Sequence, residues 1–251
     1  MAMKKILAIS NSFGVDANRY LYGISRVGGE SVKVVTLFIG GCSLYRHYRC
    51  MLSEEKAYAL YVCGIDSGFK VSLKEALLSD EWDIVTLQQV SHQSGDFSTY
   101  EPFLSELSAY VKKLAPNAKQ YIHAIWAYSD TRIKTASKDF KYATAAEMFA
   151  ADRAAYRMAA EKIGAEGLIP ATSAMEKLYN AIGDAAYRDG AHASNGVGRY
   201  MLALVWYMTI FGKSIDGLVY RDFDVPVSEE EIAIAERCAK EAVAENDYKK
   251  I

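Results

Sequence analysis

Short apolar runs alternate with longer segments of helical periodicity along this chain, and the alternation restricts its fold more than any other feature. The apolar runs predict strands, and several are apolar throughout, as strands buried on both faces are. They cover residues 5–9, 32–38, 83–87, 120–125 and 166–169. Strands that alternate with helices become parallel neighbours joined by right-handed crossovers. The sequence therefore predicts an α/β fold, a three-layer αβα sandwich around a parallel sheet of about five strands.

The helical segments lie between and after these runs. They cover residues 16–26, 44–51, 72–78, 100–114, 143–163, 171–182, 195–211 and 228–246. Asp16 is the candidate N-cap of the first helix, and Ser72 with Glu75 matches a capping box. Residues 58–72 interrupt the alternation and predict a small inserted hairpin. Because no repeat or linker is visible, we expect residues 1–251 to form a single domain.

Composition and charge restrict the partners and the location. The chain carries 29 Lys and Arg against 31 Asp and Glu, which leaves no basic surface for nucleic acid or an anionic membrane. Its longest apolar runs, such as residues 201–210, reach about half the length that spans a bilayer. The run after Lys5 ends at Ile9, too soon for a typical signal peptide. We expect a cytoplasmic protein, although a secreted one with its signal removed would present the same pattern.

The cysteines and histidines have no metal-ligand spacing. They are Cys42, Cys50, Cys63, Cys238, His47, His92, His123 and His192. A chain of this size does not need disulfide staples, so we expect reduced and mostly buried thiols. The histidines lie on separate segments, and no glycine-rich phosphate loop of the nucleotide-binding type is present. We therefore expect no metal and no cofactor. Cys42 as an alternative nucleophile has no paired base in the sequence.

Polar residues follow three of the predicted strands, where ligands bind in an open α/β sheet. Ser12 stands between a strand and a helix, where the helix dipole and free N–H groups favour a developing negative charge. An ordinary turn would use the same residue type. Gly40 and Gly41 let the backbone approach a ligand or form a tight turn. Gln88 and Gln89 offer carboxamide donors to an oxyanion, or belong to a solvated loop.

Asp189 and His192 stand three residues apart in a Gly-Ala turn before a predicted helix. At this spacing the carboxylate can accept from one ring nitrogen while the other faces outward. Such a pair supplies the base, and the group that orients it, for a serine nucleophile. A lone histidine more often has a structural role, but this arrangement favours catalysis.

Taken together, these residues resemble the ordered sequence blocks of SGNH/GDSL hydrolases. The matching features are Ser12 after the first strand, Gly41 with Cys-Ser after the second, a carboxamide after the third, and Asp189-Gly-Ala-His192 near the end. They are most similar to a poorly characterised bacterial branch with Gly-Asn-Ser-Phe, Leu-Gln-Gln and Asp-Gly-x-His blocks. The resemblance covers about the whole chain and implies a flavodoxin-like sandwich that hydrolyses esters, commonly of acyl or acetyl groups.

The resemblance also implies a role for each residue. Ser12 is the nucleophile, His192 the base and Asp189 the residue that orients the base. The backbone N–H groups of Ser12 and Gly41 form two arms of the oxyanion hole.

The third arm departs from the family pattern, because the usual Gly-x-Asn-Asp block is absent. Gln88 or Gln89 would replace its asparagine, and Gln88 matches the related branch most directly. The usual Gly-Asp-Ser is also changed, to Ser10-Asn11-Ser12.

Four residues are candidates for substrate binding: Asn11, His92, Trp126 and Tyr187. Polar and aromatic side chains after the third and fourth strands suit a sugar ring, which stacks on one face and forms hydrogen bonds at its edge. No long apolar lid of a lipid-surface enzyme is visible. Carbohydrate esterases in the same superfamily support this by analogy. We expect a serine esterase that removes short acyl groups, above all O-acetyl, from a carbohydrate or similar small polar substrate through an acyl-enzyme.

Two other functions stay open on the sequence alone. One is an acyltransferase that uses the same triad, and the other is a non-catalytic, ligand-binding domain of flavodoxin-like fold. The aromatic residues could also be packed in the core. The natural ester and the oligomeric state are not predicted.

Overall fold

The computed structural model describes residues 2–136 and 140–248. Its centre is a seven-stranded sheet with the strand order β4-β3-β2-β1-β5-β6-β7. The strands are β1 Lys4–Ser10, β2 Val32–Phe38, β3 Tyr58–Val62, β4 Ile65–Val71, β5 Ile84–Leu87, β6 Lys119–His123 and β7 Gly167–Ile169. The five strands β2, β1, β5, β6 and β7 run parallel, with Ala8 opposite Thr36 on one side and Thr86 on the other.

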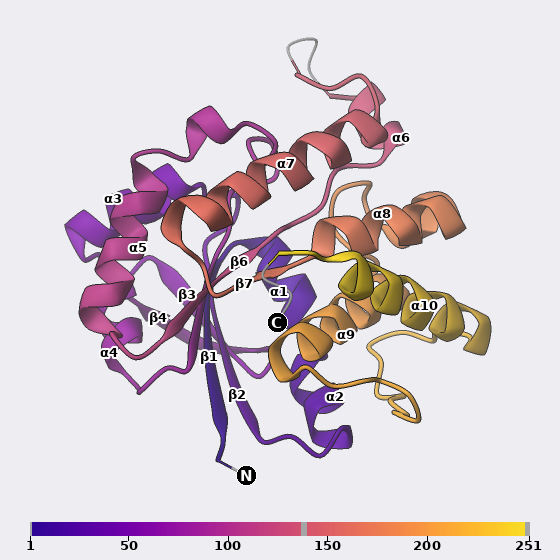
Figure 1. The fold of residues 1–251 in the computed structure, drawn as a ribbon, viewed down its shortest axis with the longest axis horizontal. Coiled ribbons are helices and arrows are strands. Elements are labelled where there is room, and N and C mark those ends of the chain that lie inside the picture. The colour runs from indigo at the N-terminus through magenta and orange to yellow at the C-terminus, as the bar shows by residue number, and fades with distance from the viewer. Residues whose placement is uncertain (1, 137–139, 249–251) are drawn as a thin grey trace.

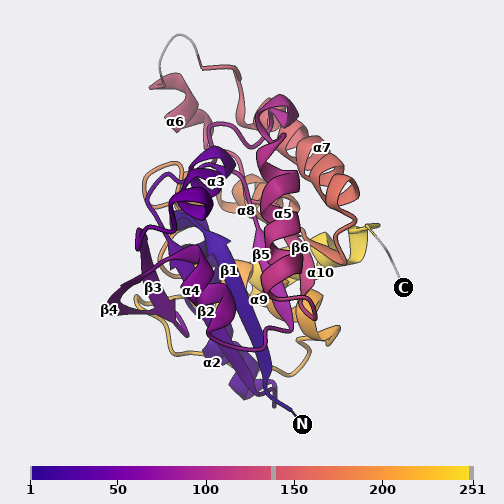
Figure 2. The ribbon, with the colours of Figure 1, turned by 90° about the vertical axis from the view of Figure 1, so that its left-hand side faces the viewer.

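Helices cover both faces of this sheet. They are α1 Ser12–Asn18, α2 Leu21–Val27, α3 Leu44–Ser53, α4 Leu73–Leu78, α5 Phe103–Leu114, α6 Asp130–Lys134, α7 Ala145–Ile163, α8 Ala171–Ile182, α9 Val197–Phe211 and α10 Glu229–Glu245. Figures 1 and 2 show α3, α4, α5 and α7 on one face, and α1, α2, α8, α9 and α10 on the other. The α/β prediction is confirmed, because a strand buried on both faces needs a helical layer on each side.

The number of strands is larger than the predicted five, and the reason lies in the hairpin. Strands β3 and β4 form the expected hairpin, but β3 also pairs with β2 in antiparallel orientation, with Tyr61 opposite Thr36. The hairpin therefore extends the sheet instead of standing apart from it. At the exposed edge, β4 carries the solvent-facing Phe69, and its middle residues are mostly polar.

The first predicted helix needs a larger correction. The chain turns helical at Ser12, four residues earlier than expected, and a break at Arg19 and Tyr20 separates α1 from α2. The N-cap is Asn11, whose side chain accepts from the backbone N–H of Phe13 at 3.1 Å. Asp16 is therefore not a cap; it lies inside α1 and is almost completely buried.

The sheet order places a switch point between β1 and β5. From β1 the chain passes to β2 on one side, whereas β5 leads to β6 on the other. A crevice opens beyond the carboxyl ends of two such strands, and ligands bind there in open α/β sheets. Ser12 follows β1 and Gln88 follows β5 at this edge. Among helices in the described parts of the chain, none is long and apolar enough to cross a bilayer.

Candidate active site

Ser12 is the first helical residue of α1 and lies partly exposed just beyond the end of β1. The helix approaches the strand closely, since a Cβ on Gly14 would lie 1.8 Å from Ser10 Oγ. Only glycine permits this approach, which brings the helix N-terminus and Ser12 to the edge of the sheet. At this position the backbone N–H of Ser12 has no acceptor in the described part of the chain.

The turn of residues 189–192 presents His192 to Ser12. One carboxylate oxygen of Asp189 accepts from the backbone N–H groups of Ala191 and His192, at 3.0 and 2.7 Å. The other lies 2.7 Å from His192 Nδ1. Gly190 completes the turn with φ +77°, where a side chain would also collide with Arg132. The local sequence thus folds the aspartate back onto the histidine that follows it.

Ser12, His192 and Asp189 form one hydrogen-bonded chain. His192 Nε2 lies 2.8 Å from Ser12 Oγ, on the side of the ring opposite the carboxylate. Partial burial by itself raises the pKa of the Asp189 carboxyl, but the hydrogen bonds from His192 and Ala191 outweigh it and lower the pKa to about 2. An ionised Asp189 accepts the Nδ1 proton, so Nε2 is free to accept the proton of Ser12.

A buried ion cluster joins α1 to the turn of residues 189–192. Arg188 Nη1 lies 2.8 and 2.9 Å from the two carboxylate oxygens of Asp16, four residues after Ser12 in α1. Arg199 in α9 donates to the same carboxylate at 2.9 Å. Arg188 also donates to the backbone oxygen of Ala193, at 2.7 Å. The residues on both sides of the Asp189–His192 turn are therefore anchored to α1.

The Phe13 ring packs against the His192 imidazole, and Trp126 packs behind Phe13. Phe13 lies with its ring centre 5.3 Å from that of His192 and 4.6 Å from that of Trp126. Trp126 is fully buried and donates its indole N–H to the backbone oxygen of Ala191 at 2.9 Å. Tyr187 is buried and donates to the backbone oxygen of Ala127. Trp126 and Tyr187 thus position the turn, and neither borders the open space next to Ser12, whereas Phe13 does.

A cavity of about 270 Å³ opens around the Ser12 hydroxyl. Its lining residues are Ser12, Phe13, Gly41, Val90, Ser91, His92, Tyr128, Arg132, Asp189, Ala191 and His192. Gly41 is exposed and has φ +59°, a conformation that favours glycine. No acceptor among the described residues takes its backbone N–H. The N–H groups of Ser12 and Gly41 are therefore both available to a ligand beside the hydroxyl.

Gln88 lies outside this cavity, in contrast to its predicted role as an oxyanion donor. Its side chain is buried and donates from Nε2 to Asn11 Oδ1 at 2.9 Å. Its oxygen accepts from His123 Nδ1 at 2.9 Å, and Asn11 Nδ2 donates in turn to the backbone oxygen of Cys42. This chain of hydrogen bonds joins the carboxyl ends of four neighbouring strands. It also occupies Asn11, which lies under the cavity instead of in its lining.

The side-chain carboxamide of Gln89 is also fully hydrogen-bonded to other groups of the protein. Its oxygen accepts from the backbone N–H groups of Leu44 and Val90, each at 2.9 Å, and its Nε2 donates to both the backbone and the side-chain oxygen of Thr99. Each polar group of this buried carboxamide has a partner, so none points to Ser12. The glutamines satisfy backbone groups that the ends of buried strands would otherwise leave without partners.

His92 does border the cavity, together with residues that the sequence reasoning did not assign to the site. Ser91 Oγ and the hydroxyl of Tyr128 form a 2.7 Å hydrogen bond in the wall. Arg132, in the short helix α6, also lines the cavity, and no motif in the sequence marks it. The rule that sites collect beyond the carboxyl ends of strands applies to the segment after β6, and it could have identified this residue.

His47, His123 and Cys42 are buried in the core and do not line the cavity. Burial lowers the pKa of His47 and of His123 to about 3. Burial also raises the pKa of the Cys42 thiol to about 12, so the reactive thiolate is disfavoured. Throughout residues 2–136 and 140–248, no three His, Cys, Asp or Glu side chains gather as ligands for a metal ion.

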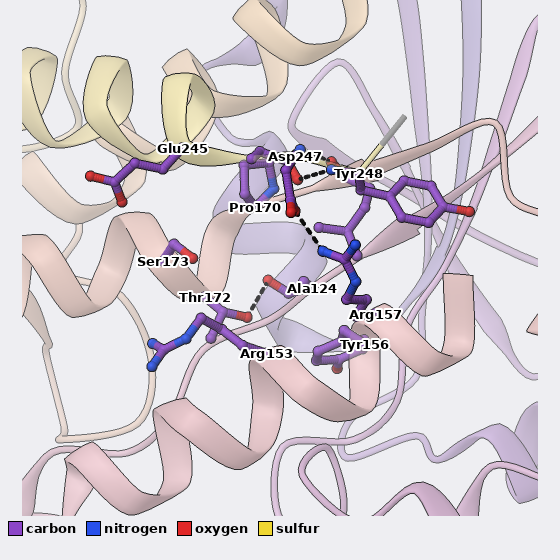
Figure 3. A pocket seen from close by; sticks show the side chains of 12 residues that line it. Ala124, Arg153, Tyr156, Arg157, Pro170, Thr172, Ser173, Glu245, Asp247 and Tyr248 are labelled. Atoms are coloured by element: carbon purple, nitrogen blue, oxygen red, sulfur yellow. Dashed lines mark hydrogen bonds and ion pairs between the residues drawn. The ribbon is translucent and has the colours of Figure 1, made fainter. Parts of the chain in front are cut away.

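A second cavity, of about 250 Å³, lies between α7, the start of α8 and residues 245–248 (Figure 3). The Thr172 hydroxyl in its wall donates to the backbone oxygen of Ala124, and Arg157 is paired with Asp247. The described lining contains no histidine or cysteine and therefore no such base beside a hydroxyl. The cavity around Ser12 is the better candidate for chemistry.

Comparisons with known proteins identify the family to which this chain is similar over nearly its whole length. A family model described as "Domain of unknown function (DUF4886)" matches residues 5–242. The crystal structure of a DUF4886 family protein from Bacteroides uniformis ATCC 8492 has a TM-score of 0.88 at 28% identity, covering 98% of this chain and 97% of that one. A comparison with curated proteins found no match.

Two enzymes share the fold at low identity. The psychrotrophic esterase EstA from Pseudoalteromonas sp. has a TM-score of 0.53 at 12% identity, covering 83% of this chain and 97% of the esterase. A lipase/acylhydrolase from Enterococcus faecalis has a TM-score of 0.53 at 13% identity, covering 90% of this chain and 100% of that one. At 12% and 13% identity, the similarity between this chain and the two enzymes shows a shared fold and nothing more.

Proposed function

Because this chain belongs to the DUF4886 family, whose description assigns no activity, we propose a function from its own site: it is a serine ester hydrolase. The observation that carries the proposal is the chain from Ser12 Oγ to His192 Nε2, at 2.8 Å, and from His192 Nδ1 to Asp189, at 2.7 Å. These contacts join the nucleophile, base and orienting carboxylate of a catalytic triad. The fold shared with an esterase and a lipase/acylhydrolase, and the sequence resemblance to SGNH/GDSL hydrolases, support the same chemistry.

The geometry suits a two-step mechanism. His192 Nε2 takes the proton of Ser12 as Oγ attacks the ester carbonyl, and the N–H groups of Ser12 and Gly41 hold the oxyanion. His192 then gives the proton to the leaving alcohol, and Ser12 keeps the acyl group. Water, deprotonated by His192, attacks the acyl-enzyme and releases the carboxylic acid and the free serine. Asp189 remains ionised and stabilises the imidazolium in both steps.

The cavity narrows the class of substrate. Its volume of about 270 Å³ is below the range of about 300–1,000 Å³ that holds drug-sized ligands, so we propose a short acyl group such as acetyl. The polar wall of Ser91, His92 and Tyr128 suits a polar alcohol, such as a carbohydrate. Phe140 stacks on Tyr128, with ring centres 5.7 Å apart, and Trp126 is buried. Hydrogen bonds therefore carry more of the proposed sugar recognition than stacking does.

A covalent probe and a kinetic assay test this function. Wild type is expected to be labelled by a fluorophosphonate and to hydrolyse 4-nitrophenyl acetate. Ser12→Ala is expected to lose both, with a rate loss on the order of a million-fold, as in a well-studied triad enzyme. Ser53→Ala, which removes an exposed serine at the end of α3, is the control and keeps both. A Ser12→Ala protein with more than about a tenth of the wild-type rate would contradict the assignment, given that expected loss.

The same assay separates hydrolysis from transfer. Addition of a sugar alcohol as acceptor is expected to leave the release of free acid nearly unchanged if water is the natural nucleophile. An acyltransferase on the same triad would instead form acylated acceptor at the expense of acid.

A further inference from the structure

We infer that the alcohol part of the substrate carries an anionic group, a carboxylate or a phosphate, and that Arg132 binds it. The inference rests on the proposed ester hydrolase function, because it assigns the charge of the substrate of that same site. Its basis is the position of Arg132, the lack of a partner for its guanidinium among residues 2–136 and 140–248, and the hydrogen-bonding groups of the cavity wall.

Arg132 is held directly against the turn that carries the base. Ser129 caps α6 by accepting from the backbone N–H of Arg132 at 3.2 Å, and its own N–H donates to the backbone oxygen of Gly190 at 2.8 Å. A Cβ on Gly190 would lie 2.7 Å from Arg132 Cβ. The stem of the arginine therefore packs on the Asp189–His192 turn, and the residue lines the cavity with Ser12.

The guanidinium of Arg132 has no hydrogen bond or ion pair with any residue that the structure describes. By contrast, Arg188 and Arg199, which anchor the turn of residues 189–192, share the carboxylate of Asp16. A guanidinium presents a planar fork of donors that fits carboxylate and phosphate oxygens in pairs. An unpaired fork in the wall of a site is suited to an anion.

The other polar groups in the cavity leave the charge of Arg132 uncompensated. Asp189 is the one carboxylate among the described residues of the lining, and the backbone N–H groups of the turn and the His192 ring already occupy its oxygens. The hydroxyls of Ser91 and Tyr128 are bonded to each other. The cavity thus has an excess of donors, which matches a ligand rich in acceptors.

The side of the ester that meets Arg132 follows from the mechanism. His192 gives its proton to the leaving oxygen, so the alcohol lies next to the turn of residues 189–192 during cleavage. Arg132 packs on Gly190 in that same turn. The anion therefore belongs to the alcohol, whereas the acyl group lies toward the N–H groups of Ser12 and Gly41.

Three acetate esters that share one sugar ring test the inference: acetylated glucose, acetylated glucuronate and acetylated glucose 6-phosphate. Wild type is expected to have a higher kcat/KM for at least one of the two anionic esters than for the neutral one. Arg132→Gln is expected to lower the anionic-to-neutral ratio of kcat/KM about tenfold or more, mainly through KM, because it removes a charge-assisted contact. Comparison of the glucuronate and phosphate esters identifies the anion.

Two further variants control the experiment. Lys134→Gln removes a positive charge from the same helix but from outside the cavity lining, and it is expected to keep the wild-type ratio. Arg132→Lys keeps the charge and loses the fork, so an intermediate ratio is expected. An equal drop in the ratio for Lys134→Gln would indicate long-range electrostatics and overturn the assignment to Arg132.

Failure of the inference differs from failure of the proposed function. If wild type hydrolyses 4-nitrophenyl acetate through Ser12 but does not favour either anionic ester, or if Arg132→Gln leaves the ratio unchanged, the inference is wrong and the hydrolase stands. If Ser12 is neither labelled by fluorophosphonate nor needed for hydrolysis of 4-nitrophenyl acetate, the proposed function fails and the inference fails with it.

Discussion

Two loops enclose the Ser12 hydroxyl, and they are held in place by opposite kinds of interaction. The base loop, residues 187–194, is anchored by ionised groups. On its buried side, the amide loop, residues 88–99, is anchored by neutral carboxamides and hydroxyls and by one buried carboxyl group, and its ion pair between Asp96 and Lys141 lies at the surface. Charged groups therefore hold the His192 ring beside Ser12, whereas neutral groups bury the ends of the strands.

In the base loop, each charged side chain has a partner of the opposite sign or several donors. Asp16, which is 1% exposed, accepts from Arg188 and Arg199. Asp189 accepts from two backbone N–H groups and from the His192 ring. These partners offset the cost of removing charged groups from water.

In the amide loop, Gln88 and Gln89 bind backbone and amide groups of neighbouring segments. Ser94 donates to its own loop's Ser91 carbonyl and lies 2.7 Å from Asp152, a fully buried residue of α7. Burial raises the pKa of Asp152 well above its usual range, although the Ser94 hydrogen bond opposes the shift. The loop therefore packs on a carboxyl group that is stable when protonated.

The largest expected effect on kcat comes from removing the negative charge of Asp189 in the base loop. Asp189→Asn is expected to lower kcat by about a thousand-fold or more, because the imidazolium loses its counter-charge and the ring its tautomer. Measurement of kcat and of thermal stability separates this loss from unfolding. A nearly wild-type kcat would mean that a Ser–His dyad suffices. In that case the charge that anchors the base loop would not be needed for catalysis.

The next effect concerns the anchor of the base loop. Asp16→Asn leaves Arg188 and Arg199 without their buried partner, so we expect the free energy of unfolding to fall by about 3 kcal/mol, the lower end for a broken buried pair, since both arginines can reach solvent. We also expect kcat to fall, because α1 and the turn would lose their common anchor. Asp224→Asn, which affects the exposed part of the same cluster, serves as control and is expected to have smaller effects. Equal losses for the two variants would argue against a special role of Asp16.

The amide loop is expected to respond in stability more than in rate. Gln88→Ala and Gln89→Ala each leave buried polar groups without partners, which costs about 1–3 kcal/mol of unfolding free energy. Since neither side chain borders the cavity, we expect kcat to fall less than the hundred- to thousand-fold typical of a lost oxyanion donor. Urea unfolding and kcat, measured on the same preparations, check both. A hundred-fold loss of kcat at unchanged stability would restore the original assignment of these glutamines.

The effect expected at Asp152 concerns stability and its dependence on pH, and not the rate. Its pKa is raised by folding, so the folded protein keeps the proton while the unfolded chain loses it above about pH 4. Between that pH and the raised pKa of the folded state, wild type therefore loses up to about 1.4 kcal/mol of stability per pH unit through this group. Asp152→Asn removes this contribution, and the difference in unfolding free energy between variant and wild type is expected to grow from pH 5 to pH 8.

Asp96 in the same loop offers a matched control of opposite sign. Hydrogen bonds from Ser98 and Lys141 lower the pKa of its carboxyl, so its contribution to stability is present above the unfolded pKa and is lost as the pH falls. Asp96→Asn is therefore expected to leave the slope between pH 5 and pH 8 unchanged. A variant Asp152→Asn with the wild-type slope would mean that the buried carboxyl is ionised after all.

Local patterns in the sequence were enough for the layers of the fold and for the candidate catalytic residues. Hydrophobic periodicity depends on which faces are buried, and a chain of strands alternating with helices has few ways to bury them. Ser12, placed after the first strand, and Asp189 and His192, three residues apart, depend on contacts that their own short segments make. Their roles could be proposed before any tertiary contact was known.

The tertiary structure alone decided which distant groups satisfy each buried polar residue. Asp16 has the local appearance of a helix cap, but its partners are Arg188 and Arg199, more than 170 residues away. Gln88 has the appearance of a free donor, yet it is bonded to Asn11 and His123 on other strands. A buried polar group must find a partner, and the sequence near it does not say which segment will supply one. The long-range packing of the chain makes that choice, and among the described residues it supplies no partner for the guanidinium of Arg132 at the wall of the site.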